Sequence, residues 1–377
     1  MATSTIPSEI TDPVNARILA VSEDRIAGFL EDPFTEIAQA SGVPVAQVLE
    51  RLRVMLDQGV IRRIRQTMMA TNLAPGALVA WRVAADGLDA GFEYLSKHDP
   101  FSGHVVIRST DAETPGSVYR LWTTLKVPQG YSMEKHCALL ASRIGASAFR
   151  IMPAKRLFAL GVGHVRRRGM EPGSRTAEPG QVIDTNLVEL SPLEWRVLGA
   201  LKREFAPGEL STTPWRARAD EAGVSYAEFL RVAAGLAARG VIGRFSTFLE
   251  HVKPSSAGER VTRYNALFHW RVPVGREIEA GREVGRHHIL THAYWREGGA
   301  EFADVNIMAV AHGTDKATVL AHKAAIDEHL AAIGIPVTYT NVFWGGRSEI
   351  KPSEIMPDAY AAWLQSLGID PASMRAA

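Results

Sequence analysis

An internal duplication is the feature that most constrains this fold, because the second half of the chain repeats the motif order of the first. Three pairs of segments correspond: Gly59-Val60-Ile61 with Gly240-Val241-Ile242, Leu78–Val83 with Leu267–Val272, and Gly103–Arg108 with Thr291–Arg296. The last two pairs have the same spacing to within one residue, as expected of a tandem repeat. The sequence therefore predicts two copies of one architectural unit.

Each copy begins with helical periodicity and ends with alternating strands and helices. In the first copy Val48, Leu52 and Leu56 recur at helical spacing, and Gly59 ends this helix before an extended basic segment, Arg62–Arg65. This order is typical of a winged helix-turn-helix. The segments that follow read strand, helix, strand, strand, helix, strand, which is the ferredoxin-like order βαββαβ. The predicted fold class is α+β.

Composition shifts and Gly/Pro-rich stretches give the domain boundaries. Ser191 before Pro192 is a helix start that marks the second copy. The predicted segments are a winged helix-turn-helix at 12–72, a ferredoxin-like domain at 77–166, a linker at 167–186, a second winged helix-turn-helix at 187–253, a second ferredoxin-like domain at 262–350 and a C-terminal tail at 351–377.

Composition excludes several classes of protein. The hydrophobic fraction of 46% and charged fraction of 22% are those of a globular protein, and 42 basic side chains nearly balance 41 acidic ones. A dedicated nucleic-acid binder normally has a basic surplus. Cys137 is the only cysteine, which excludes an internal disulfide and Cys-based metal centres. Without a signal-peptide pattern or a membrane-length apolar run, we expect a cytoplasmic protein that does not enter the membrane.

The candidate chemistry lies in two predicted strands near residue 300. His292, Tyr294 and Arg296 alternate, so an extended strand places all three on one face. Asp304–His312 reads as a second strand that ends in another histidine. Histidine transfers protons near neutral pH, and arginine binds carboxylates with two hydrogen bonds. The same pattern also fits a half-buried strand pair without a function, and His287 and His288 read as a solvated turn.

The two copies differ at this candidate site. His104 corresponds to His292 and Arg108 to Arg296, but Val106 replaces Tyr294. We expect no counterpart of His312 in the first copy, because the aligned strand ends near Lys126. The sequence thus predicts one complete site and one degraded site. The two ferredoxin-like domains could pack either sheet to sheet or edge to edge.

These motifs together resemble a known family. A winged helix-turn-helix ending in Gly59-Val60-Ile61-Arg62-Arg63, followed by a βαββαβ domain, resembles the Lrp/AsnC regulators. The chain is more similar to the siroheme decarboxylases, through Trp81-Arg82-Val83, Thr291–Arg296 and Ala311-His312-Gly313. Two features depart from the family pattern: the aromatic run before the second strand reads Phe302–Asn306, and Ile242-Gly243-Arg244 has lost one of two paired arginines.

The resemblance implies non-oxidative loss of carbon dioxide from two acetate side chains of siroheme, in heme d1 or alternative heme biosynthesis. It implies no cofactor beyond the iron tetrapyrrole substrate and no separate metal site. His292 and His312 would donate protons or contact the macrocycle, and Tyr294 would assist. The residues expected to bind the substrate are Arg296, Arg244, Arg62, Arg63, His104, Arg108 and Asn306.

Two other functional classes stay open at this point. One is a ligand-responsive transcriptional regulator, although Gln47, Arg51 and Arg53 make the first candidate recognition helix only modestly basic. The other is a heme-binding protein without catalysis, which would keep the histidines but would not need Tyr294. The expected partner is a tetrapyrrole, DNA is not expected, and a homodimer is one assembly that the sequence allows.

Overall fold

The two copies of the repeat are interleaved into two compact units. The structure is a computed structural model that describes residues 6–160, 170–184, 187–250 and 263–376. Among them, unit 1 contains residues 6–69 and 188–250, where both winged helix-turn-helix domains are predicted. Unit 2 contains residues 70–160, 170–184 and 264–376, where both ferredoxin-like domains are predicted. The segments predicted as winged helix-turn-helix domains thus lie in one unit, and those predicted as ferredoxin-like domains lie in the other.

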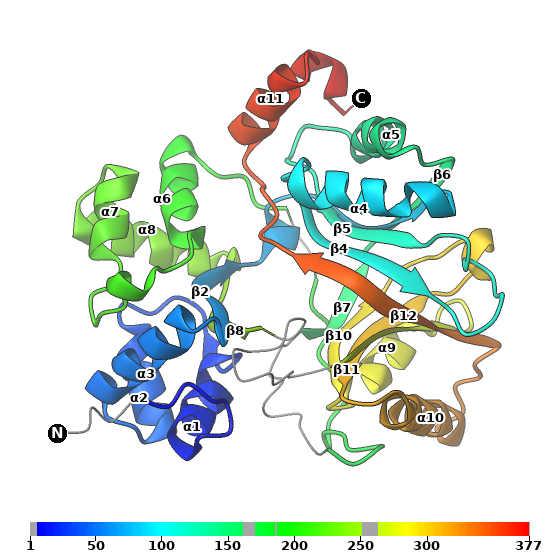
Figure 1. Ribbon diagram of the computed structural model, residues 1–377, viewed down its shortest axis with the longest axis horizontal. Coiled ribbons are helices and arrows are strands. Elements are labelled where there is room, and N and C mark those ends of the chain that lie inside the picture. The colour runs from blue at the N-terminus through cyan, green and yellow to red at the C-terminus, as the bar shows by residue number, and fades with distance from the viewer. Residues whose placement is uncertain (1–5, 161–169, 185–186, 251–262, 377) are drawn as a thin grey trace. The chain divides into compact units, whose positions relative to one another are not determined.

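Unit 1 holds three helices from each copy and a sheet that both copies share (Figure 1). The first copy contributes α1 (Pro13–Ser22), β1 (Ile26–Ala27), α2 (Pro33–Ser41), α3 (Val45–Asp57) and β2 (Ile61–Met68). The second contributes α6 (Pro192–Lys202), the short 3₁₀ helix η3 (Pro207–Glu209), α7 (Arg216–Ala222), α8 (Tyr226–Ala238) and β8 (Ile242–Leu249).

The helix starts and the sheet of unit 1 follow from particular side chains. Asp12 and Asp32 accept hydrogen bonds from the first backbone N–H groups of α1 and α2, and Ser191 and Glu194 form the capping box of α6. The strand order is β1-β8-β2, so the wing of the second copy lies between two strands of the first. Cross-copy pairing therefore binds the two helical domains together.

Unit 2 contains the βαββαβ order twice. The first set is β3 (Gly76–Arg82), α4 (Leu88–Lys97), β4 (Ser102–Ser109), β5 (Leu121–Lys126), α5 (Met133–Ile144) and β6 (Ala148–Pro153). The second set is β9 (Tyr264–Arg271), α9 (Glu277–Gly285), β10 (Leu290–Trp295), β11 (Ile307–Gly313), α10 (Lys316–Ala332) and β12 (Tyr339–Ile350). This confirms the predicted α+β class and the duplicated ferredoxin-like domain. Among the described residues, no helix is long and apolar enough to cross a membrane.

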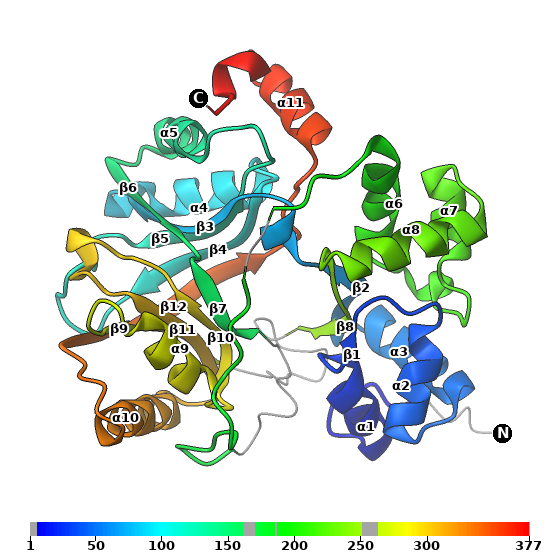
Figure 2. The ribbon, with the colours of Figure 1, turned by 180° about the vertical axis from the view of Figure 1, so that it is seen from behind.

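The strands of unit 2 form one continuous sheet in the order β6-β3-β5-β4-β12-β9-β11-β10-β7. β12 pairs with β4 of the first set, and β7 (Arg156–Leu160) pairs with β10 of the second. Only Ala154 and Lys155 separate β6 from β7. The last strand in this order, β7, is therefore a direct continuation of the first strand, β6. The two ferredoxin-like domains are thus joined edge to edge at both borders. Figures 1 and 2 show β12 and the β7–β10 pair from opposite sides.

Helices cover the outer faces of this sheet, and the inner faces meet each other. The helices α4 and α5 pack with Trp81 and Leu121, while α9 and α10 pack with Trp270 and Ile307. A third cluster contains the strand side chains that alternate with these, from both sets, and Tyr119, Phe302 and Val305 from connecting segments. Its strand members are Ala80, Val106, Trp122, Met152, Leu267, Met308 and Phe343. Because strand side chains alternate between faces, this third cluster identifies the inner face.

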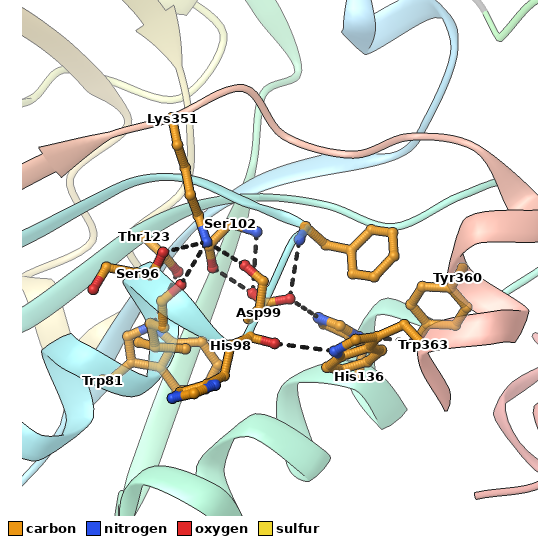
Figure 3. A network of polar contacts seen from close by, with 12 residues as sticks. Trp81, Ser96, His98, Asp99, Ser102, Thr123, His136, Lys351, Tyr360 and Trp363 are labelled. Carbon is orange, nitrogen blue, oxygen red and sulfur yellow. Dashed lines mark hydrogen bonds and ion pairs between the residues drawn. The ribbon is translucent and has the colours of Figure 1, made fainter. Parts of the chain in front are cut away.

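The segment after β12 is anchored on the first ferredoxin-like domain (Figure 3). It contains α11 (Pro357–Ser366) and the 3₁₀ helix η5 (Pro371–Met374). Lys351 donates to the carbonyls of Leu95 and Ser96 at the end of α4, at 3.0 and 2.7 Å. The Tyr360 hydroxyl lies 2.9 Å from Nδ1 of the buried His136. The predicted C-terminal tail is therefore an ordered part of unit 2.

A strap from the predicted linker, residues 170–184, lies against the second ferredoxin-like domain. Thr176 and Gly180 donate backbone hydrogen bonds to carbonyls of Arg286 and Arg282. His287 is only 2% exposed, its ring lies 5.4 Å from that of His329, and burial lowers its pKa to about 3. The prediction that His287 belongs to a solvated turn is wrong, because α10 and the strap cover it.

We expect Tyr360→Ala to lower the free energy of unfolding of the chain by about 3 to 5 kcal/mol, the usual cost of truncating a buried aromatic side chain. Tyr360 is fully buried against Phe101, at a ring distance of 4.7 Å. Urea unfolding followed by circular dichroism measures the change. Gln365→Ala, on the exposed side of the same helix, is the control. Equal stability of the two variants would show that this segment does not stabilise unit 2.

Candidate functional site

His292, Tyr294 and Arg296 lie together on the inner face, as their alternation predicts. The rings of His292 and Tyr294 are stacked, with centroids 6.0 Å apart and planes 11° from parallel. The Arg296 guanidinium lies 4.4 Å from the centre of the Tyr294 ring and donates to the carbonyl of Met152 on β6. A cation over an aromatic face stabilises this column of side chains. Desolvation raises the pKa of Tyr294 and lowers that of Arg296.

His312 joins this column through Thr291. The Thr291 hydroxyl donates to the carbonyl of Val310, at 3.2 Å, so it accepts from Nδ1 of His292 at 3.1 Å and from Nδ1 of His312 at 3.5 Å. Asn265 donates to Nε2 of His312, at 2.9 Å. The tautomer of His312 that fits these two contacts has its proton on Nδ1.

Arg108 extends the network into the first ferredoxin-like domain. Its guanidinium donates to Oδ1 of Asn265, at 3.1 Å, and to the carbonyl of Phe343, at 3.2 Å. Arg108 is 4% exposed, and burial lowers its pKa to about 9. His104, on the same strand, lies 3.2 Å from the hydroxyl of Ser348. Residues of both copies therefore line the same inner face.

The remaining predicted residues lie elsewhere. Asn306 uses its amide to bind the backbone of Val272 in both directions and also the carboxylate of Glu277, so its side chain is committed to the fold. Arg62, Arg63 and Arg244 belong to the shared sheet of unit 1. Their role in holding carboxylates, like that of Asn306, stays a prediction.

The arginines of unit 1 form an electrostatically coupled group. Arg63 pairs with Glu204 at 3.1 Å. Burial, together with the positive charges of Arg63, Arg62 and Arg244, lowers the pKa of the neighbouring Arg65 to about 10, and the negative charge of Glu204 opposes this shift. Such a group can attract an anion.

Lys126 is a residue of the inner face that the sequence reasoning placed only at a strand end. In the first copy Trp81 pairs with Leu121, and in the second Trp270 pairs with Ile307. Lys126 lies five residues after Leu121, and His312 lies five residues after Ile307. The two residues therefore hold equivalent positions in their strands. The expectation that His312 has no counterpart is therefore wrong, because strand register places a lysine there. The equivalence follows from the strand pairing of Trp81 and Trp270, which the structure supplies.

His269 was also missed. It alternates with the outward Phe268 and Trp270, is 1% exposed and lies 4.8 Å from the ring of Phe343. Burial, with a smaller effect of Arg108, lowers its pKa to about 3. His269 is consequently a neutral group among the inner aromatic side chains.

The charges of the inner face all have one sign. In strands β3–β6 and β9–β12, the inward positions carry no aspartate or glutamate. The basic and imidazole side chains at these positions are Arg82, Arg108, Lys126, Arg150, Arg271, His104, His269, His292 and His312, and Arg296 follows β10 directly. Arg150 and Arg271 form ion pairs with Glu301 and Asp304, whereas the buried Arg108, Lys126 and Arg296 form none among the described residues. Buried cations without matching carboxylates are costly unless a ligand supplies the negative charge. This face is therefore suited to an anion.

Fold and site define a class of protein with paired winged helix-turn-helix and AsnC-like domains. Residues 73–159 match the family described as AsnC-like ligand binding domain, and residues 29–62 match the siroheme decarboxylase NirDL-like HTH domain. Both matches agree with the resemblance of the sequence to the siroheme decarboxylases.

Two relatives described as siroheme decarboxylase subunits are similar to this chain. The siroheme decarboxylase NirDL subunit of Paracoccus pantotrophus is 26% identical over 270 residues, which cover 70% of this chain and 74% of the relative. The siroheme decarboxylase beta subunit of Desulfovibrio desulfuricans is 27% identical over 132 residues, 35% of this chain and 77% of that subunit.

Solved structures confirm the fold. The crystal structure of the siroheme decarboxylase NirDL has a TM-score of 0.66 at 20% identity, with 94% of this chain and 98% of that chain covered. A NirDL complex with an iron-uroporphyrin III analogue has a TM-score of 0.64 at 19% identity, with 94% and 99% covered.

We expect Lys126→Met to stabilise the ligand-free chain more at about pH 6 than at about pH 9. Burial lowers the Lys126 pKa from 10.5 to about 7. Its unfavourable contribution is thus complete below pH 7 and fades as the pH rises toward the unfolded value. Urea unfolding at both pH values measures the difference, with the exposed Lys97→Met as control. A variant that is less stable than the wild type at both pH values would contradict this expectation.

Proposed function

We propose that this chain is a siroheme decarboxylase that binds a carboxylate-rich iron tetrapyrrole against the inner face of unit 2. The observation that supports this most is the inner face itself, whose inward strand positions hold arginine, lysine and histidine but no carboxylate. The related NirDL structure was determined in complex with an iron-uroporphyrin III analogue, an iron tetrapyrrole. The iron tetrapyrrole is the substrate of the proposed reaction.

The reaction needs a place for each carboxylate and a source of protons. In non-oxidative decarboxylation, the bond between the acetate methylene and its carboxylate breaks and carbon dioxide leaves. The electron pair of that bond stays on the methylene carbon, delocalised into the macrocycle, and one proton completes a methyl group. No electron acceptor is consumed, and each acetate takes up one proton.

His292 is suited to supply that proton. Its Nδ1 donates to Thr291, which fixes the ring orientation. Its Nε2 is then the atom that would carry and release the proton. The neighbouring Tyr294 can donate a hydrogen bond to the reacting group, because desolvation raises its pKa and keeps the phenol protonated. His312 would serve the same face from the adjacent strand.

The arginines would hold carboxylates. Arg296 and Arg108 are both buried, at 8% and 4% exposure, and neither forms an ion pair among the described residues. A guanidinium in such surroundings binds a carboxylate more strongly than one in water, because the interaction is less screened. Arg62, Arg63 and Arg244 lie in unit 1, where their positive charge would attract an acidic substrate without forming part of the inner face of unit 2.

A regulator of transcription is less well supported by the contacts of α3. Arg51 pairs with Asp12 at 3.3 Å, and Arg53 donates to the carbonyl of Leu210. These are the basic side chains that a recognition helix would offer to DNA phosphates. A gel shift with genomic DNA fragments at increasing salt tests this alternative, and salt-sensitive binding would favour it.

Anaerobic incubation of the purified chain with siroheme, without an added oxidant, should yield a product that lacks two carboxyl groups by mass spectrometry. We expect His292→Ala to lower the initial rate about 100-fold or more, the usual contribution of a positioned proton donor. His104→Ala should retain more activity, because Val106 in place of Tyr294 leaves the first copy without the phenol.

The exposed His98→Ala is the matched control and should keep the wild-type rate. Equal loss in His292→Ala and His104→Ala would mean that both copies share the chemistry. No decarboxylated product from the wild-type chain, together with no change of the siroheme spectrum on mixing, would overturn the proposed function.

A further inference from the structure

The first copy of the repeat places Lys126 where the second copy has His312. The two residues are equivalent by strand pairing: Lys126 pairs with Gly76 on β3, and His312 pairs with Asn265 on β9. In the second copy, Asn265 fills the space beside the strand and binds His312, at 2.9 Å. In the first copy a glycine stands in place of that asparagine.

Gly76 makes room for the lysine side chain. A Cβ atom at Gly76 would lie 2.6 Å from Nζ of Lys126 and 3.0 Å from its Cδ. Even alanine at this position would therefore displace the ammonium group. Where the second copy has Asn265 and His312, the first copy has Gly76 and Lys126. This difference places a flexible cation at the same position on the inner face.

Lys126 lies near a second cation and no anion. Desolvation is the main cause that lowers its pKa to about 7, and the positive charge of Arg296 is the second. Among the described residues, no carboxylate forms an ion pair with Lys126 or raises its pKa. Part of the side chain remains accessible, so a ligand can reach it. Two neighbouring cations in such surroundings are unfavourable until an anion joins them.

Arg108 and His312 are the corresponding pair across the repeat. Arg108 corresponds to Arg296, and Asn265 connects it to His312. Each pair combines an arginine of one copy with a residue of the other copy. The inner face thus has two cationic groups, each built around one arginine. Arg108 is joined by the imidazole of His312, and Arg296 is joined by the ammonium of Lys126.

We propose that Lys126 and Arg296 form a second carboxylate-binding half-site, so that unit 2 holds an anionic ligand at two ends. This inference rests on the proposed function, since the tetrapyrrole supplies the carboxylates. Lys126 binds rather than reacts in this assignment: its ammonium and the Arg296 guanidinium share one carboxylate group. The Arg108–Asn265–His312 group holds another.

The test is a double-mutant cycle on the binding of iron uroporphyrin III, followed by visible absorbance at constant pH. Lys126→Met and Arg296→Met should each weaken binding about 10- to 100-fold, as expected for a charge-assisted contact. Because both hold one carboxylate, the double variant should bind no more than a few-fold worse than the weaker single variant. Lys126→Met combined with Arg108→Met should instead multiply the two losses.

Three controls make the outcomes distinct. Lys97→Met should bind as the wild type does, and Lys126→Arg should recover much of the lost affinity because it restores the charge. Unfolding curves of every variant show whether it is folded. Replacing a lysine that only supported the fold would lower stability, whereas replacing a binding lysine lowers affinity without a loss of stability. Failure of the wild-type chain to bind the porphyrin would overturn the proposed function itself.

If the wild-type chain binds and Lys126→Met binds equally well, the half-site is wrong and the proposed function stands. Multiplicative losses for Lys126→Met and Arg296→Met would also overturn it, since the two cations would then hold different groups.

Discussion

Edge-to-edge pairing between the two copies is the constraint on which the site depends. β4 pairs with β12, and β10 pairs with β7, which continues from β6. These pairings turn two ordinary ferredoxin-like sheets toward each other, so that Trp122 of one lies 5.2 Å from Phe343 of the other. A single such domain would leave this face exposed to water. Joined, the two domains lower the dielectric around the buried polar side chains of the inner face, such as Arg108 and His269.

The low dielectric makes it energetically costly to keep the side chains of the inner face charged. The depressed pKa values of Arg108, Lys126 and His269 share one main cause, burial. No carboxylate occupies an inward strand position to offset these charges. The fold thus tolerates an electrostatic cost that a polyanionic ligand would remove. In unit 1 the arginine group is different, since Arg63 already has Glu204 as a partner.

Much of this arrangement could be predicted from the sequence, because it depends on local periodicity. The duplication and the alternation of His292, Tyr294 and Arg296 gave the βαββαβ order and the shared face. The role of Lys126 could not be found in that way: its equivalence to His312 rests on the hydrogen-bonded register of β3 with β5 and of β9 with β11. The burial of His287 depends on a distant helix and on the strap, which local pattern does not reveal.

The central claim is that the ligand binds on the inner face of unit 2. A crystal structure of the chain with iron uroporphyrin III, with the iron located by its anomalous scattering, tests this most directly. We expect an iron position on the inner face, with macrocycle carboxylates bound to Arg108 and Arg296 and with His292 beside the ring. An iron bound only at the arginines of the unit 1 sheet, with the inner face of unit 2 unchanged, would contradict it.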